Sequence, residues 1–94
     1  MDLTLLRAFV TVARVGNLTR AAAQLHLTQP AVSLQLKNLQ EVLGVALFSR
    51  TAHGLVLTRD GQALLPYAER ALAAAGEVER AAAALRQEVR GKLR

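Results

Sequence analysis

Residues 17–44 read NLTRAAAQLHLTQPAVSLQLKNLQEVLG, and they contain two short helical patterns separated by a turn. The first pattern covers residues 20–25 and follows Thr19, which we expect to be its N-cap. Residues 26–27 form the turn, and Thr28 is expected to cap the second helix. Two short helices joined by so short a turn predict a helix-turn-helix.

The second helix of this stretch is predicted from Gln29 to Leu43, with Gly44 as its end and Pro30 in its first turn. Apolar side chains recur in steps of four, three and four, which predicts a core-facing side: Val32, Leu36, Leu39 and Leu43. The opposite side is polar at three positions one turn apart: Gln29, Ser33 and Lys37. Pro30 and Leu34 lie beside them, so this is the surface that would meet a ligand.

A helix over residues 3–15 is predicted ahead of this stretch, and Gly16-Asn17 ends it. One apolar stripe faces the core: Leu6, Phe9, Val10 and Ala13. A second stripe runs beside it: Leu5, Ala8, Val12 and Val15. The second stripe fits equally well with a single broad core face and with contact to a partner.

Two short β-type runs follow, at residues 45–48 and 55–57, on either side of residues 49–54. Gly54 supplies the positive φ that a tight connection needs. A hairpin directly after the second helix of a helix-turn-helix is a wing. The fold class predicted is mainly α: a winged helix-turn-helix with a two-stranded β wing.

A long helix begins after Thr58, its expected N-cap, and Asp60 in the first turn suits the helix dipole. Its apolar residues form an unbroken heptad seam: Leu64, Ala68, Ala71, Ala75, Val78, Ala82, Leu85 and Val89. The stretch from Leu64 to Ala71 is expected to lie partly along its own domain, and the part beyond Ala75 against a second chain. The domains predicted are 1–58 for the winged helix-turn-helix, 59–90 for the linker and dimerisation helix, and 91–94 for the start of a hinge.

Composition argues against several classes of function. The chain has no cysteine, so disulfides, thiol catalysis and cysteine zinc sites are absent. Its two histidines, His26 and His53, belong to no catalytic or metal-ligand motif, and no phosphate-binding glycine loop occurs. No apolar run is long enough to span a membrane. We therefore expect no enzyme activity, cofactor or metal, and a soluble cytoplasmic protein associated with the nucleoid.

The charge pattern fits a nucleic-acid partner. Residues 1–58 carry five Lys/Arg and two acidic residues, and the whole chain has a formal net charge of +5. Gln29 suits bidentate pairing with adenine, Ser33 a base or phosphate, and Lys37 the DNA backbone. Further candidates for phosphate or the minor groove are Thr19, Arg20, Thr28, Arg50 and His53. The rival interpretation is a protein-interaction module, but a protein-binding groove would favour apolar anchors over these polar side chains.

These segments resemble the LysR-type transcriptional regulators. The similarity lies in residues 9–13, 17–22, 25–33, 39–44 and 47–50, with Leu57-Thr58 and Gly61 at the entry to the long helix. It covers essentially the whole chain, and its motifs are long and in order. The resemblance implies sequence-specific binding to a double-stranded operator.

The resemblance also implies a role for each region of the chain. Such domains read the major groove through the positions held here by Gln29, Pro30, Ala31, Ser33 and Leu34, and the wing tip probes the minor groove. They dimerise through antiparallel linker helices. Full regulators continue into a sensor domain that binds a small-molecule inducer, and they usually form tetramers. The chain is thus expected to be a fragment without its sensor.

Two positions depart from the family pattern, which often has arginine where this chain has Leu34 and His53. An arginine paired with guanine contributes about 1–3 kcal/mol of discrimination at that base, and Leu34 would contact a thymine methyl instead. A histidine is largely uncharged near pH 7, so His53 is expected to contact the minor groove more weakly than arginine would.

Overall fold

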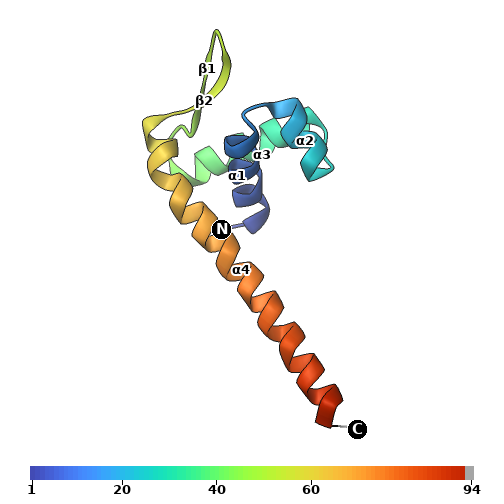
Figure 1. The fold of residues 1–94 in the computed structure, drawn as a ribbon. Coiled ribbons are helices and arrows are strands. Elements are labelled where there is room, and N and C mark those ends of the chain that lie inside the picture. The colour runs from blue at the N-terminus through green and yellow to red at the C-terminus, as the bar shows by residue number, and fades with distance from the viewer. Residues whose placement is uncertain (93–94) are drawn as a thin grey trace.

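The computed structural model describes the backbone of residues 1–92 and the side chains of residues 1–88. Its elements follow in the order α1 (Leu3–Val15), α2 (Leu18–Leu25), α3 (Gln29–Leu43), β1 (Phe48–Thr51), β2 (Gly54–Leu57) and α4 (Arg59–Lys92). Helices α1 to α3 form a small bundle, the hairpin projects from one end of it, and α4 extends away from it (Figure 1). The predicted winged helix-turn-helix with a long C-terminal helix is confirmed.

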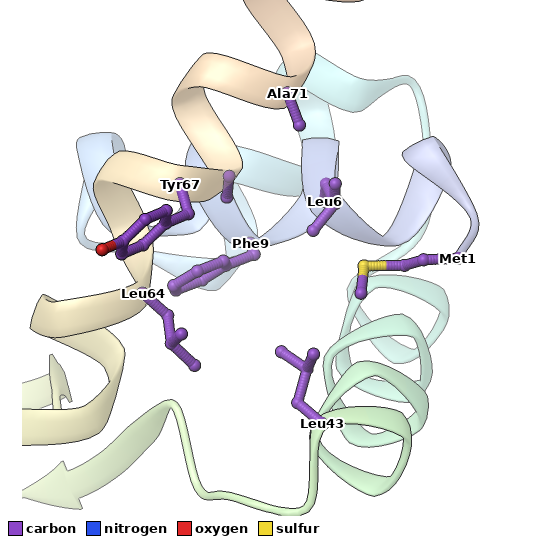
Figure 2. A pocket seen from close by; sticks show the side chains of 8 residues that line it. Met1, Leu6, Phe9, Leu43, Leu64, Tyr67 and Ala71 are labelled. Atoms are coloured by element: carbon purple, nitrogen blue, oxygen red, sulfur yellow. The ribbon is translucent and has the colours of Figure 1, made fainter.

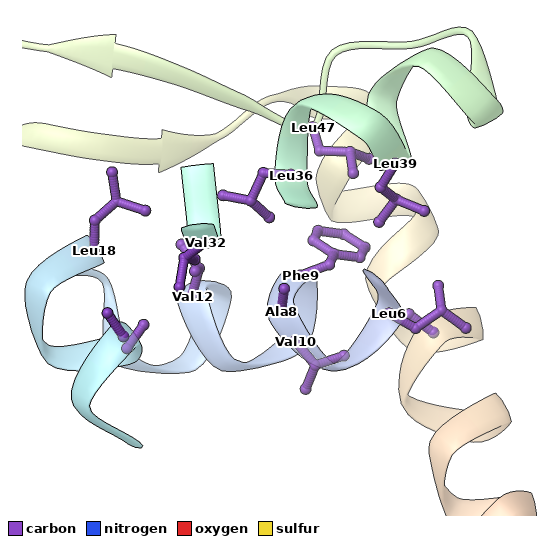
Figure 3. Packing of buried hydrophobic residues seen from close by; sticks show 13 residues of the cluster. Leu6, Ala8, Phe9, Val10, Val12, Leu18, Val32, Leu36, Leu39 and Leu47 are labelled. Carbon is purple, nitrogen blue, oxygen red and sulfur yellow. The ribbon is translucent and has the colours of Figure 1, made fainter. Parts of the chain in front are cut away.

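Helix α1 lies at the centre of the core and contacts α2, α3 and α4. The largest fully buried side chains come from α1, α3 and the segment before the wing, and Figure 3 shows them packed together: Phe9, Val12, Val32, Leu39 and Leu47. Phe9 also meets Phe48 edge to face, with ring centroids 5.7 Å apart. In the second stripe of α1, Ala8 and Val12 are buried and the other two side chains pack against the core. The two stripes therefore form one broad core face.

The helix ends show where polar side chains replace missing backbone partners. Asn17, not Thr19, is the N-cap of α2: its side chain accepts a hydrogen bond from the Arg20 N–H at 2.9 Å. The prediction that Thr19 caps this helix is wrong because Asn17 already occupies that position, and α2 begins at Leu18. The Thr28 cap of α3 is confirmed, with its hydroxyl accepting from the Ala31 N–H.

The wing is an antiparallel hairpin in which Phe48 pairs with Leu57 and Thr51 with Gly54. The predicted first strand, residues 45–48, is wrong: β1 begins where that run was expected to end, and it uses residues assigned to the loop. The cause is Leu47. Its side chain is fully buried in the core, so the backbone is free to pair with β2 only after this residue. Gly54 has a φ of 105°, as the predicted turn requires.

Helix α4 has 34 residues and reaches Lys92, so it continues past the boundary predicted at residue 90. Thr58 caps it as predicted, with the Gly61 N–H donating to the Thr58 hydroxyl at 2.9 Å. The molecule is elongated, with principal extents of 62 × 25 × 19 Å. Residues 93–94 of the predicted hinge lie outside the described part of the chain. The side chain of Val89, the last residue of the predicted heptad seam, also lies outside it.

Candidate nucleic-acid interface

The N-terminal end of α3 is exposed, and this places the first residues of the helix at the surface. Thr28, Gln29 and Pro30 are all exposed. Val32 on the opposite side is fully buried, which fixes the rotation of the helix about its axis. The backbone N–H groups at the start of a helix carry a partial positive charge, so this end is suited to a negatively charged ligand.

Gln29 is joined to the preceding helix by its side chain. The Thr19 hydroxyl donates a hydrogen bond to Oε1 of Gln29 at 3.4 Å. This contact leaves the amide N–H groups of Gln29 free to donate to acceptors outside the protein. Thr19 was predicted as a phosphate contact; the structure places it beside the predicted base reader.

The wing faces α2 and α3 across two adjacent hollows that share Arg50. One, of about 230 Å³, lies between the start of α2 and the wing and brings together Thr19, Gln29, Arg50 and His53. The other, of about 220 Å³, lies between α3 and the wing and brings together Ser33, Lys37 and Arg50. Helices α2 and α3, strand β1 and the turn of the wing thus place six of the predicted contact residues around one concave surface.

The hollows carry positive charge without acidic neighbours in their walls. Arg50 lines both, Lys37 lines one, and neither is lined by an aspartate or glutamate. In the described residues Arg14 forms an ion pair with Glu69 at 3.4 Å, but this lies on the α1–α4 side of the molecule. Lys37 and Arg50 therefore present their charge to the space between α3 and the wing.

The remaining predicted contacts lie outside the hollows. Leu34 is 58% exposed, so its side chain is accessible to a ligand. Pro30 and Arg20 are exposed too, and Ala31 is half-buried. None of these four residues lines either hollow, and neither does Thr28, the fifth remaining contact.

Gln40 holds the wing against α3, and the sequence analysis did not identify it. Its Oε1 accepts hydrogen bonds from the backbone N–H groups of Leu47 at 2.8 Å and Phe48 at 3.4 Å. One side-chain oxygen therefore accepts hydrogen bonds from two backbone N–H groups at the base of β1. Nothing in the local pattern distinguishes Gln40 from an ordinary polar residue of α3, because its partners come from the following loop.

The predicted dimerisation seam divides into two parts on α4. Leu64, Ala68 and Ala71 pack on the core of their own chain, and Ala68 is only 5% exposed. Farther along, Val78 is 70% exposed and Leu85 is 61% exposed. The expectation that the first part of the seam lies along its own domain is confirmed. The second part has no partner among the described residues of the chain.

The described residues hold no group of three or more side chains of the type that binds metal ions. Among the helices of that same part of the chain, none is both long and apolar enough to cross a membrane.

The sequence matches a family model described as bacterial regulatory helix-turn-helix protein, lysR family, over residues 3–62. The HTH-type transcriptional regulator CfxR of Cupriavidus necator is 44% identical over 93 residues, which cover 99% of this chain and 29% of that protein. The HTH-type transcriptional activator AmpR of Pseudomonas aeruginosa is 54% identical over 66 residues, covering 70% of this chain and 22% of that protein. The chain thus spans less than a third of the length of either regulator.

Two solved complexes with DNA contain a similar fold. The DNA-binding domain of CbnR bound to DNA superposes with a TM-score of 0.81 at 40% identity, covering 89% of this chain and 98% of that chain. The DNA-binding domain of BenM bound to catB site 1 DNA gives a TM-score of 0.85 at 32% identity, covering 90% of this chain and 96% of that chain. Both neighbours are domains of about the extent of this chain, crystallised in complex with DNA.

Proposed function

Since the chain belongs to the lysR family of bacterial regulatory helix-turn-helix proteins, we propose that it binds a two-fold-related operator as a homodimer. The observation that carries this proposal is the concave surface between α2, α3 and the wing, where Gln29, Lys37 and Arg50 converge. Helix α3 would enter the major groove, with Gln29, Pro30, Ala31, Ser33 and Leu34 near the base edges. The wing would follow the backbone into the minor groove.

The remaining polar residues then divide by task. Lys37, Arg50, Arg20 and Thr28 would contact phosphates, which supply affinity without sequence information. His53 at the wing turn would reach the minor groove. Thr19 would orient Gln29 through the hydrogen bond between them and also lie near the backbone. In a longer regulator, an additional domain would sense a small-molecule inducer and add the contacts for a tetramer. Such a regulator would act in the cytoplasm, at the nucleoid.

Replacing Gln29 with alanine is expected to reduce discrimination between operator and random duplex without unfolding the chain. Gln29 is exposed, so its loss leaves the core intact, whereas one bidentate base contact is worth about 1–3 kcal/mol, or roughly 5- to 150-fold, for each half-site that the dimer reads. The ratio of operator to random-duplex Kd, measured by fluorescence anisotropy, checks this. Gln87→Ala on the far part of α4 is the matched control, and full discrimination by Q29A would show that Gln29 does not read bases.

The exposed Leu34 makes a second prediction about sequence preference. A leucine offers no hydrogen bond to guanine but can contact the thymine methyl, so selection from random duplexes is expected to enrich A·T at the facing position. Leu34→Arg is expected to shift the preference there toward G·C. A strict G·C requirement in the parent chain would contradict the contact.

A further inference from the structure

The wing stands away from the helical bundle, so its direction depends on how its base is held (Figure 1). The hollow of about 220 Å³ separates it from α3, with Lys37 on one wall and Arg50 on the other. With α3 in the major groove and the wing in the minor groove, the sugar–phosphate backbone between the two grooves has to run through this hollow. The angle between the wing and α3 then decides whether both cations meet that backbone together.

Gln40 joins α3 to the base of the wing. Its Oε1 accepts hydrogen bonds from the N–H groups of Leu47 at 2.8 Å and Phe48 at 3.4 Å. Within the described part of the chain, no other hydrogen bond links α3 to the wing or to the loop before it. Gln40 also lines the hollow itself, three residues after Lys37. One side chain thus borders the space for the DNA and holds the base of β1, the strand that carries Arg50.

The other contacts at the base of the wing lead to α1 and α4. The Leu47 side chain is buried in the core, and the Phe48 ring meets Phe9 of α1 edge to face. Thr58, the N-cap of α4, donates from its hydroxyl to the Ala46 carbonyl and from its N–H to the Leu47 carbonyl. These contacts keep the base of the wing on the core, but they leave its angle relative to α3 to Gln40.

The contact between Phe9 and Phe48 has open space beside it. Figure 2 shows Phe9 with Leu43 and Leu64 around an apolar pocket of about 240 Å³. Close packing confines a side chain to one position, and the pocket leaves part of the Phe9 ring without such packing. The aromatic contact is therefore a weaker constraint on the direction of the wing than the two hydrogen bonds.

A small swing of the wing matters because of where Arg50 and His53 lie along it. Arg50 is two residues beyond Phe48 on the same face of β1, about 7 Å away, and His53 is up to about 17 Å away. A swing of about 10° about Phe48 would move the backbone at these positions by about 1 Å and about 3 Å. Donor–acceptor distances in hydrogen bonds vary by only about 0.5 Å, so shifts of this size weaken the contacts that both side chains make.

We propose that Gln40 is a positioning residue for DNA binding. By accepting both N–H groups, its Oε1 sets the angle of the wing against α3, so that Arg50 and Lys37 reach the same phosphate backbone together. Gln40 acts through Arg50 and makes no base contact. The inference rests on the DNA binding proposed above and adds the residue that aligns the wing with the recognition helix.

A double-mutant cycle between Gln40 and Arg50, measured by fluorescence anisotropy at one fixed salt concentration, tests this role. Arg50→Gln alone is expected to raise the Kd for a duplex selected from a random pool about 30-fold, because each subunit loses a charge-assisted contact. Gln40→Met keeps the volume and removes the acceptor, and it should raise the Kd about 10-fold. In the Q40M background, R50Q should cost only about 3-fold more, because Arg50 is already out of place. The double variant is then about 30-fold weaker than the parent, against about 300-fold for independent effects.

Gln40→Glu tests whether the acceptor is the group that matters. A carboxylate oxygen can accept from both N–H groups, but the carboxylate has no N–H of its own. Its negative charge near Lys37 lowers the affinity for DNA with and without Arg50, so the quantity compared is the cost of R50Q. That cost should return to about 30-fold in Q40E.

Gln35→Met is the matched control in the same helix. Gln35 is half-buried, and its Oε1 has no hydrogen-bond partner among the described residues, so methionine removes no hydrogen bond of that oxygen. The Kd and the cost of R50Q should both match those of the parent. Circular dichroism checks that Q40M is folded at the assay temperature. If it is not, Gln40→Asn, which shortens the reach by one methylene group, replaces it and should also lower the cost of R50Q.

The outcomes separate this inference from the proposed function. A parent chain that binds no duplex contradicts DNA binding and the role of Gln40 together. A parent that binds, with R50Q as costly in Q40M as in the parent, leaves DNA binding standing and overturns the role of Gln40. The same holds if R50Q costs as little in Q40E as in Q40M, because the amide N–H groups would then be responsible. A reduced cost in Q40M, with the full cost in Q40E and Q35M, supports the inference.

Discussion

Gly61→Ala is expected to lower the free energy of unfolding by about 3 kcal/mol, at the upper end of what one added methyl group costs a packed site. A Cβ at residue 61 would lie well inside van der Waals contact with the backbone oxygen of Leu47 and would touch Cδ2 of Leu57. The oxygen cannot move easily, because it accepts a hydrogen bond from the Thr58 N–H at 2.9 Å. The methyl group must therefore push α4 away from the base of the wing.

The measurement is thermal unfolding followed by circular dichroism. For a domain of this size, 3 kcal/mol corresponds to a Tm lower by roughly 12–24 °C. Gly76→Ala is a matched control in the same helix: its Cβ would meet only the flexible end of Arg80, so alanine should leave stability unchanged or raise it by up to about 1 kcal/mol. A G61A variant as stable as its parent would show that the contact between α4 and Leu47 is looser than described.

The affinity for duplex DNA is expected to fall about 10³-fold between 50 and 200 mM salt. A dimer that neutralises about six phosphates gives a log–log slope near −5, because each neutralised phosphate releases a bound counterion. Lys37 and Arg50 are the cations that line the space between α3 and the wing. Lys37→Gln or Arg50→Gln should each make the slope shallower by about 2 per dimer, one charge in each subunit.

Arg80→Gln provides the control for this series, since it removes one positive charge from α4, well outside the hollows. Its slope should match that of the parent chain. A chain that shifts no duplex at low salt, or whose affinity does not depend on salt, would instead favour the protein-interaction module as its function.

The sequence predicted the helices well because their limits depend on neighbouring residues. Gly16 and Gly44 end α1 and α3 in the left-handed conformation, and Thr28 and Thr58 cap the helices that follow them. The N-cap of α2 was misplaced because Asn17 was assigned with Gly16 to the end of the preceding helix, whereas its side chain accepts the hydrogen bond from the Arg20 N–H. Asparagine ranks above threonine as an N-cap, so local preference itself favoured Asn17.

The parts that depend on distant contacts were less predictable. The start of β1 is set by the burial of Leu47 and by the Gln40 amide, which comes from another element. The arrangement of the candidate site was partly foreseen: Gln29, Ser33 and Lys37 share a face of α3 by their spacing. Their meeting with Arg50 and His53 depends on how the wing folds back, which spacing along the chain does not specify.

The joint between the wing and α4 has a mechanical consequence. Thr58, Gly61 and Leu47 join the base of the hairpin to the start of a 34-residue helix that is about 50 Å long. Because α4 also packs on the core as far as Leu72, only the part beyond it, about 30 Å long, is free to swing, and a tilt of about 5° there displaces the far end by about 3 Å. A small tilt of α4 is thus magnified into a larger displacement at the opposite end of the molecule, and the absence of a side chain at residue 61 lets the start of α4 lie close to the base of the wing.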